Sequence, residues 1–323
     1  MEHAWFLTGA LGCIGAWVAM AVIDRGDVPV VFDLGGDPRR LRDVLGEEAL
    51  ARVRFVRGDI ADLDAVLGAM REHRVAHVVH LAGLQVPFCK ADPPLGARVN
   101  VLGTVNVLEA AKRSGVNRVV YASSAAVYGP PAPGAGPPDE RAPAEADTHY
   151  GIYKRANEGN ARIYWQDEGL SSIGLRPLTV YGVGRDQGLT SGPTAAMKAA
   201  VLGREYTIPF TGATDFNYVA DTAAAFVECA LRGPEGAHVF NLHGDSVPVT
   251  AIVDAIHARL PEGAPRLIRC EGPELPIPPA LDGSALDRAV PGLPRTPLAD
   301  GVAETMRRFA ALRDEGRLDT REL

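Results

Sequence analysis

Short apolar runs alternate with amphipathic stretches through the first 180 residues of the chain. The apolar runs, of a length typical of buried strands, lie at 4–7, 28–32, 53–56, 77–81, 118–123 and 172–176. Stretches with helical spacing lie between or after them, at 14–23, 62–74, 100–114 and 150–168. This alternation predicts an α/β fold in which helices cover both faces of a doubly wound parallel sheet, as in Rossmann domains.

The alternation weakens after residue 180, where proline-rich stretches at 261–279 and 291–297 separate short elements. We therefore expect a Rossmann domain at 1–180 and a smaller C-terminal substrate lobe at 181–323, interleaved with sheet strands near 215–242. The substrate is expected between the two lobes, because ligands of open α/β sheets bind at the carboxyl ends of the strands. The Gly-, Pro- and Ala-rich segment 129–143 is predicted to be a loop, either a flexible cover over the site or a spacer.

Composition and charge exclude several classes of partner. The 323 residues are 46% hydrophobic, which suffices for a large α/β domain with a smaller lobe, and the net charge of −7 comes from interspersed signs. The absence of a basic stripe argues against nucleic acid, and no apolar run is long enough for a bilayer. The first strand leaves no room for a signal peptide, and the four cysteines lack metal-ligand spacing. We expect a cytoplasmic protein with reduced thiols and no metal site.

A glycine-rich segment, TGALGCIG at 8–15, joins the first predicted strand to the first predicted helix. Its glycines allow a tight turn and let backbone N–H groups approach a pyrophosphate at the helix N-terminus. Asp33 ends the second strand about twenty residues further on, where a carboxylate binds the adenosine ribose hydroxyls. That carboxylate would repel a 2′-phosphate, so the pattern predicts NAD rather than NADP. We interpret Arg39 and Arg40, which could meet a phosphate, as the solvated start of the next helix.

Three further residues indicate redox chemistry. Tyr150 and Lys154 are four residues apart and share one face of a predicted helix. A phenol with a pKa of about 10 is a poor base at neutral pH, but a neighbouring ammonium lowers that pKa. Ser124 follows the fifth strand and can hold a substrate oxygen against Tyr150. The trio predicts hydride transfer from a secondary alcohol, with Tyr150 as the general base.

Several motifs together resemble the extended short-chain dehydrogenase/reductases, also called the NAD-dependent epimerase/dehydratase family, over about the first 240 residues. They are TGALGCIG at 8–15, Asp33, GDI at 58–60, HLAG at 80–83, Asn100, SSAAVYG at 123–129, YGIYK at 150–154, LRP at 175–177 and YVAD at 218–221. The resemblance implies that Tyr150 is the general base or acid, that Lys154 holds the nicotinamide ribose, and that Ser124 binds the reacting oxygen. It implies cofactor contacts for Gly9, Leu11, Gly12, Cys13, Ile14, Gly15, Asp33, Asp59, Ile60, Leu81, Ala82, Gly83, Asn100, Tyr150, Lys154 and Pro177.

In that family, Asp59 and Ile60 would flank the adenine, and Asn100 would be a structural or cofactor contact. Many relatives form a homodimer through the helices that correspond to 100–114 and 150–168, so we expect a homodimer here. Members that eliminate water carry an Asp-Glu pair where this chain has Ala125 and Ala126. Alanine exchanges no proton, so dehydration is disfavoured. Related decarboxylation is disfavoured as well, because it uses a Glu at the position of Ala126.

Two other departures concern the substrate. Members that act on nucleotide sugars have an Asn where Thr179 stands and an Arg where Thr214 stands, both at the diphosphate. Because charge-assisted phosphate contacts are among the stronger interactions of a site, we infer a substrate without a nucleotide diphosphate. Arg185 or Arg204 could replace the missing phosphate contacts, and this alternative stays open.

The candidate substrate residues are Gln85, Ser124, Ala125, Arg185 and Ser191. Arg185 either binds a substrate carboxylate in bidentate fashion or pairs with Asp186 at the surface, and Ser191 is either a contact or a helix cap. His80 and His243 lack further ligands at metal spacing, and His80 belongs to a strand end. We expect an NAD-dependent dehydrogenase of a small hydroxylated molecule such as a sugar, uronate or hydroxy acid. The alternative is an NAD-retaining epimerase of a sugar or nucleotide sugar.

Overall fold

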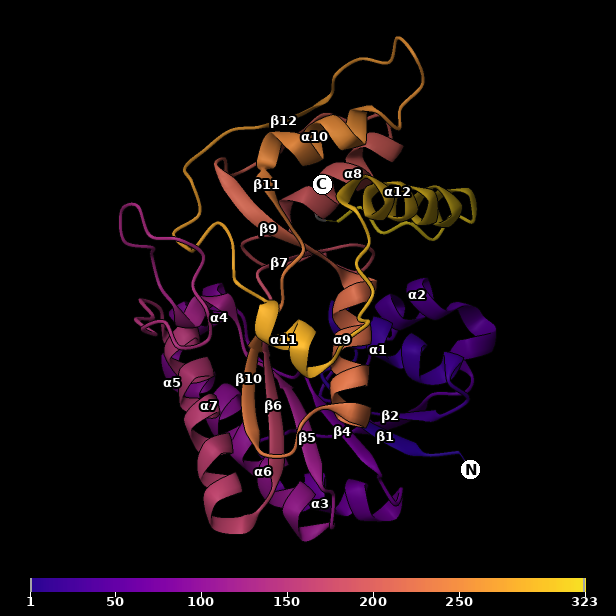
Figure 1. Cartoon of the computed structure of the whole chain (residues 1–323). Coiled ribbons are helices and arrows are strands. Elements are labelled where there is room, and N and C mark those ends of the chain that lie inside the picture. Colours follow the sequence, from indigo (N-terminus) through magenta and orange to yellow (C-terminus); the bar gives the residue numbers. More distant parts are fainter. Residues whose placement is uncertain (1, 322) are drawn as a thin grey trace.

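A seven-stranded sheet forms the larger part of the molecule, and a smaller lobe lies beyond one end of its strands (Figure 1). The computed structural model describes residues 2–321 and 323. The strand order is β10-β6-β5-β4-β1-β2-β3, and every pair is parallel. The strands are β1 (Ala4–Thr8), β2 (Val28–Asp33), β3 (Arg54–Arg57), β4 (His77–His80), β5 (Arg118–Ala122), β6 (Ser171–Arg176) and β10 (Ala237–Asn241).

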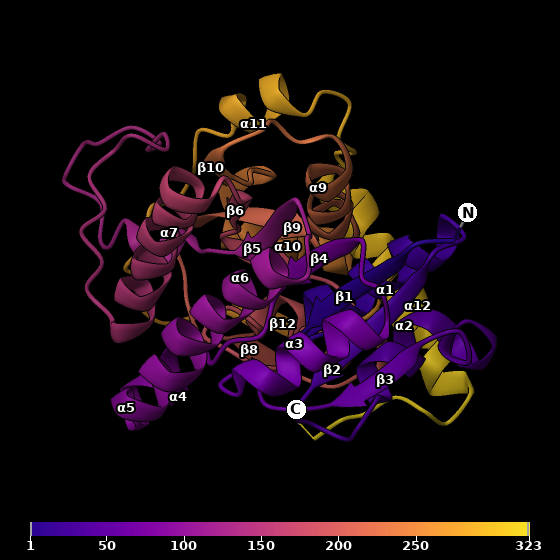
Figure 2. The same ribbon diagram turned by 90° about the horizontal axis from the view of Figure 1, so that it is seen from below.

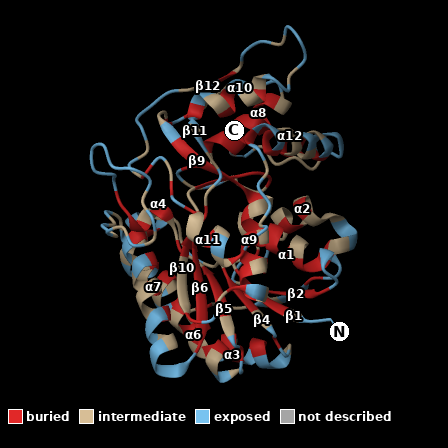
Figure 3. Ribbon diagram, in the orientation of Figure 1, coloured by how far each residue is buried: buried red, intermediate tan, exposed pale blue. Residues whose placement is uncertain are grey.

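Helices cover both faces of this sheet, as Figure 2 shows from below. Helices α3 (Leu63–Glu72), α6 (Gly103–Arg113) and α7 (His149–Glu168) lie on one face, and α1 (Cys13–Asp24), α2 (Arg39–Leu50) and α9 (Val219–Arg232) on the other. Each face has an apolar layer: Trp17, Leu41 and Phe226 belong to one, and Met70 and Leu108 to the other. The inner strands are accordingly buried, the edge strand β3 is largely exposed, and so are the outer helix faces (Figure 3). The predicted doubly wound α/β fold is confirmed.

The smaller lobe is built on two short sheets. Strand β7 (Thr179–Tyr181) pairs with β9 (Ala213–Tyr218), which pairs with β11 (Asp245–Pro248), and β8 (Tyr206–Ile208) pairs with β12 (Ile268–Cys270). Helices α8 (Gly192–Val201), α10 (Val249–His257), α11 (Ser284–Ala289) and α12 (Leu298–Asp314) complete it. Because β6 runs on into β7 and β10 into β11, the carboxyl ends of the large sheet face this lobe. None of the helices within the described residues is long and apolar enough to cross a membrane.

The connections between lobes involve distant parts of the chain. Strand β10 pairs with β6, so the large sheet is completed only after the chain has passed through β7, β8 and β9. Helix α12 and the segment after it reach back to the first domain. The guanidinium of Arg308 donates to the Val44 carbonyl, and that of Arg317 donates to the Arg42 carbonyl.

The predicted elements of the first 180 residues match the structure, with small shifts at their ends. The helix expected at 100–114 is preceded by one wider turn at Arg98–Leu102, and α4 (Val86–Ala91) and α5 (Pro93–Ala97) were not anticipated. The segment 129–143 is a loop, as predicted, and Glu140 anchors it by accepting a hydrogen bond from the Asn241 N–H.

One interpretation was wrong. Arg39 and Arg40 do begin α2, but their side chains are only 22% exposed and both guanidinium groups bind the carboxylate of Asp186.

Candidate active site

The glycine-rich turn packs against the end of β4 in a way that admits no side chain. Gly9 has φ +68°, and a Cβ there would lie 2.5 Å from the backbone nitrogen of Ala82. A Cβ on Gly15 would likewise overlap Ala10. Gly12 is the residue before α1, so the amide groups of Cys13, Ile14 and Gly15 form its first turn and have no acceptor within the helix. This cradle fits a dinucleotide pyrophosphate.

Asp33 lies beside that cradle at the end of β2. Its carboxylate accepts hydrogen bonds from the Leu11 N–H at 3.2 Å and the Gly35 N–H at 3.0 Å. A carboxylate offers about four lone-pair positions, so it can still accept hydrogen bonds from a ribose diol. Asp59 lies at the rim and pairs with Arg98, whereas the side chain of Ile60 is buried under Gly103.

Asn100 organises the stretch Leu81–Gly83 and the residue that follows it. Its side-chain amide accepts from the Leu84 N–H at 2.7 Å and donates to the Leu84 carbonyl at 2.9 Å. A Cβ on Gly83 would lie 3.3 Å from Asn100 Oδ1 and 3.5 Å from Lys154 Nζ. Asn100 therefore supports the wall of the site next to Lys154.

The structure brings Ser124, Tyr150 and Lys154 together. Thr148 caps α7 by accepting a hydrogen bond from the Gly151 N–H, which places Tyr150 in the first turn. A side chain on Gly151 would overlap the Ala126 carbonyl, so glycine lets α7 begin directly against the turn that follows β5. The Lys154 ammonium lies 5.5 Å from the centre of the Tyr150 ring and donates to the Ala122 carbonyl at 2.7 Å.

Burial dominates the ionisation of this trio. It raises the pKa of the Tyr150 hydroxyl, which a hydrogen bond with Ser124 and the charge of Arg185 oppose. Burial also lowers the pKa of the Lys154 ammonium to about 8. We expected Lys154 to lower the pKa of Tyr150; in this structure the opposing influences come from Ser124 and Arg185.

Arg185 lies on the loop between β7 and α8, close enough for its charge to act on the Tyr150 hydroxyl. The proposed surface pair with Asp186 is absent, because Asp186 binds Arg39 and Arg40 instead. The guanidinium of Arg185 donates to Thr190 Oγ1 at 3.1 Å, and its buried Nε has no hydrogen-bond partner among the described residues.

Gln85 and Arg185 meet at Gly188, which has φ +101°. A Cβ on that glycine would overlap Gln85 Oε1 and lie 3.3 Å from Arg185 Nη2. Ser191 stands before α8 and donates to the Gly188 carbonyl at 2.9 Å, so its hydroxyl holds this loop. Ala125 is buried, and its N–H donates to the Pro177 carbonyl.

The two positions expected to lack diphosphate contacts bind each other. Thr179 on β7 and Thr214 on β9 are fully buried, and their hydroxyl oxygens lie 2.7 Å apart. Arg204, the other residue considered as a replacement, is exposed beyond the end of α8. Neither threonine offers a charge to a phosphate.

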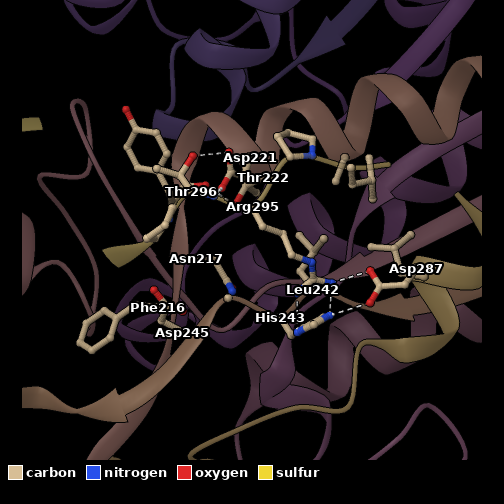
Figure 4. A pocket seen from close by; sticks show the side chains of 17 residues that line it. Phe216, Asn217, Asp221, Thr222, Leu242, His243, Asp245, Asp287, Arg295 and Thr296 are labelled. Carbon is tan, nitrogen blue, oxygen red and sulfur yellow. Dashed lines mark hydrogen bonds and ion pairs between the residues drawn. The ribbon is translucent and has the colours of Figure 1, made fainter. Parts of the chain in front are cut away.

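A cavity of about 170 Å³ lies elsewhere, between β9, α9 and the segment 293–297 (Figure 4). Asp221 accepts from the Thr296 hydroxyl at 2.9 Å, and Arg295 binds both Asp287 and His243. None of the predicted site residues lines this cavity, and its polar groups join the segment to α9, to α11 and to His243. His80 ends β4 and binds Thr8 and Thr104, consistent with its place at a strand end.

Glu158 was missed by the sequence reasoning. It accepts hydrogen bonds from Ser123 and from two nitrogens of Arg176, which joins α7 to the ends of β5 and β6. The available signal was its position four residues after Lys154, on the same face of the helix.

Comparisons with known proteins agree with this geometry. The family model described as "NAD dependent epimerase/dehydratase family" matches residues 5–242. The UDP-glucose 4-epimerase of Mycolicibacterium smegmatis is 31% identical over 322 residues, which cover 94% of this chain and 97% of that protein.

Two solved proteins are similar as well. The UDP-glucose 4-epimerase of Thermus thermophilus, solved with NAD, has a TM-score of 0.79 at 26% identity and covers 95% of this chain and 98% of its own. MoeE5, solved with UDP-glucose and NAD, has a TM-score of 0.80 at 26% identity and covers 97% and 100%. MoeE5 has also been solved with UDP-glucuronic acid and NAD.

Proposed function

The chain belongs to the NAD dependent epimerase/dehydratase family, as an NAD-dependent enzyme of the extended short-chain dehydrogenase/reductase type, and from that premise we propose that it dehydrogenates a small hydroxylated acid. The observation that carries this proposal is the Arg185 guanidinium, which meets Gln85 at Gly188, has a buried Nε without a partner among the described residues, and acts on Tyr150 by its charge. A guanidinium matches a carboxylate in bidentate geometry. A carboxylate-bearing ligand also occurs with a relative, because MoeE5 has been solved with UDP-glucuronic acid.

The residues of this chain divide the chemistry as follows. Ser124 holds the substrate hydroxyl against Tyr150, which takes the hydroxyl proton as the carbinol C–H bond breaks and the carbonyl forms. NAD, when bound, supplies the acceptor for the hydride. The hydrogen bond from Ser124 and the positive charge of Arg185 favour the ionised form of Tyr150. Arg185 and Gln85 fix the acid group so that the carbinol faces Tyr150.

The fate of the hydride distinguishes dehydrogenase from epimerase. An epimerase must return the hydride to the opposite face of the ketone, so the substrate has to turn while a remote group keeps it bound. The buried Thr179–Thr214 pair removes the two family contacts to such a remote diphosphate. Release of the ketone with reduced cofactor is therefore the reaction that this geometry favours.

A second candidate is an NAD-retaining epimerase that acts on a sugar or nucleotide sugar. The relatives favour an epimerase more than a dehydrogenase, because the UDP-glucose 4-epimerase of Mycolicibacterium smegmatis is similar over nearly the whole length of both chains.

One experiment separates the two candidates. The protein is incubated with NAD⁺ and a panel of hydroxy acids, aldonates, uronates, UDP-glucose and UDP-glucuronic acid, while NADH is followed by absorbance and epimers by NMR. We expect NADH with an acidic substrate, no turnover by Tyr150→Phe, and a raised KM for Arg185→Gln on acids but not on neutral analogues. Epimers without net NADH would establish the second candidate. If the Arg185→Gln variant turns over neutral and acidic substrates with equal KM, the proposal that Arg185 binds an acid group of the substrate is refuted.

A further inference from the structure

Asp33 and Arg40 bind the same residue of the glycine-rich turn. Leu11 donates its N–H to Asp33 at 3.2 Å, and its carbonyl accepts from Arg40 Nη1 at 3.0 Å. The Arg40 guanidinium and the Asp33 carboxylate, which is expected to face the adenosine ribose, are therefore anchored to the same residue of the turn. Arg39 is its neighbour in the first turn of α2.

Asp186 comes to these two arginines from the loop after β7. Its carboxylate accepts from Arg40 Nε at 3.0 and 3.1 Å, from Arg40 Nη2 at 2.6 Å and from Arg39 Nη2 at 2.6 Å. The Asp186 side chain is only 9% exposed. Although burial raises the pKa of its carboxyl, hydrogen bonds from Arg40 and Arg39 hold that pKa below its usual value, so the carboxylate is charged at neutral pH. Both guanidinium groups thus have an anionic partner.

The loop is fastened to the turn at further points. The Val183 carbonyl accepts from Trp17 Nε1 at 2.9 Å, and Gly184 packs against the backbone of Cys13. These contacts hold the loop in place independently of the ion pairs, so Asp186 stays next to the arginines.

NADP differs from NAD by a 2′-phosphate on the adenosine ribose. Arginines near the ribose accommodate that phosphate, because a guanidinium forms bidentate charge-assisted hydrogen bonds with it. Arg40 has the charge for this contact and binds the same turn residue as Asp33, whose carboxylate opposes it. Arg39 is its neighbour at the start of α2 and also pairs with Asp43 and Asp319.

We propose that Asp186 occupies Arg39 and Arg40 and thereby withholds them from the 2′-phosphate of NADP, so that this residue and Asp33 together set the preference for NAD. Asp186 is a specificity-determining residue that lies about 150 positions beyond the ribose-binding strand in the sequence. The inference concerns cofactor binding and is independent of the substrate proposed above.

Binding of NAD⁺ and NADP⁺ to cofactor-stripped protein, measured by isothermal titration calorimetry, tests the proposal without any turnover. The Asp186→Asn variant loses the carboxylate charge, so the arginines become available to the 2′-phosphate. NADP⁺ binding should then tighten by about tenfold or more, and NAD⁺ binding should change little. Adding Arg40→Gln to that variant should cancel the gain. The matched control is Asp319→Asn, since Asp319 pairs with Arg39 at 3.1 Å but forms no ion pair with Arg40 among the described residues.

Three outcomes would overturn the proposal: unchanged NADP⁺ affinity in a folded Asp186→Asn variant, an equal gain in Asp319→Asn, or a gain that survives Arg40→Gln. Thermal melting establishes whether each variant folds. If Asp186→Asn does not fold, Arg40→Gln alone is decisive. If Asp186 already withholds Arg40 from the cofactor, Arg40→Gln should leave the ratio of NADP⁺ to NAD⁺ affinity unchanged. A selective loss of NADP⁺ affinity in Arg40→Gln would contradict the proposal.

Discussion

Replacing Glu158 by Gln should strongly destabilise the protein, because it leaves a buried cation without its counter-charge. The side chains of Arg176 and Glu158 are only 5% and 11% exposed. Three hydrogen bonds of 2.6 to 2.7 Å reach the carboxylate, one from Ser123 and two from Arg176.

The expected size of the effect follows from these contacts. Breaking a buried ion pair by removing one partner costs about 3–5 kcal/mol, and we place Glu158→Gln at about 3 kcal/mol because the amide oxygen still accepts one hydrogen bond. Domains are stable by only about 5–15 kcal/mol, so this is a large fraction of the total. Because Glu158 lies one turn after Lys154, weaker NAD binding should accompany the loss.

Urea denaturation followed by circular dichroism measures the change in the free energy of unfolding. The control is Asp254→Asn, which removes a carboxylate from an ion pair with Arg266 in which both side chains are 68% exposed. That variant should lose less than about 0.5 kcal/mol. If Glu158→Gln lowers the free energy of unfolding by less than about 1 kcal/mol, or if both variants lower it equally, burial is not what makes the Glu158–Arg176 pair important for stability.

Three further predictions concern the glycine-rich turn, the buried lysine Lys154 and the exposed face of α7. Gly9→Ala should abolish NAD binding in calorimetry and lower the melting temperature, because a Cβ at φ +68° would collide with Ala82; near-normal binding would show that the turn can relax. The pKa of Lys154 falls from 10.5 to about 8 on burial, so the unfolded chain binds more protons between these values and stability should rise with pH there. Lys154→Met should reduce that rise in denaturation experiments across the window, and an unchanged slope would contradict it. Ile152 and Ile163 on α7 are 47% and 45% exposed, so replacing both by Lys should convert the proposed homodimer to a monomer in light scattering, whereas a monomeric parent protein would disprove the dimer.

The sequence predicts those elements that have a regular local pattern of apolar and polar residues. Strands β1 to β6 are short apolar runs, and α1, α3 and α7 follow them with regular spacing, so their order implied the doubly wound sheet. The Tyr150–Lys154 pair was found for the same reason, because one helical turn joins the two residues. The smaller lobe contains strands of three residues, such as β7 and β8, which are too short for a period to show.

Contacts between distant residues leave no such signal. The ion pairs of Asp186 join residues 146 and 147 positions apart, and nothing near Arg39 in the sequence marks them. The proximity of Gln85 to Arg185 depends on a loop conformation at Gly188 that the residue types alone do not specify. The substrate side of the site therefore depends on loops, and the cofactor side on regular elements.

The place of β10 in the sheet has a consequence for how the protein emerges from the ribosome. Strand β6 is complete at Arg176, but its outer neighbour begins only at Ala237. Synthesis proceeds at roughly 5–20 residues per second, so β6 is an unpaired sheet edge for several seconds before β10 is made. All six residues of β6 are buried in the folded protein. An open apolar edge is a template for pairing with other chains. Nascent chains stalled within this interval are the ones that most need a chaperone.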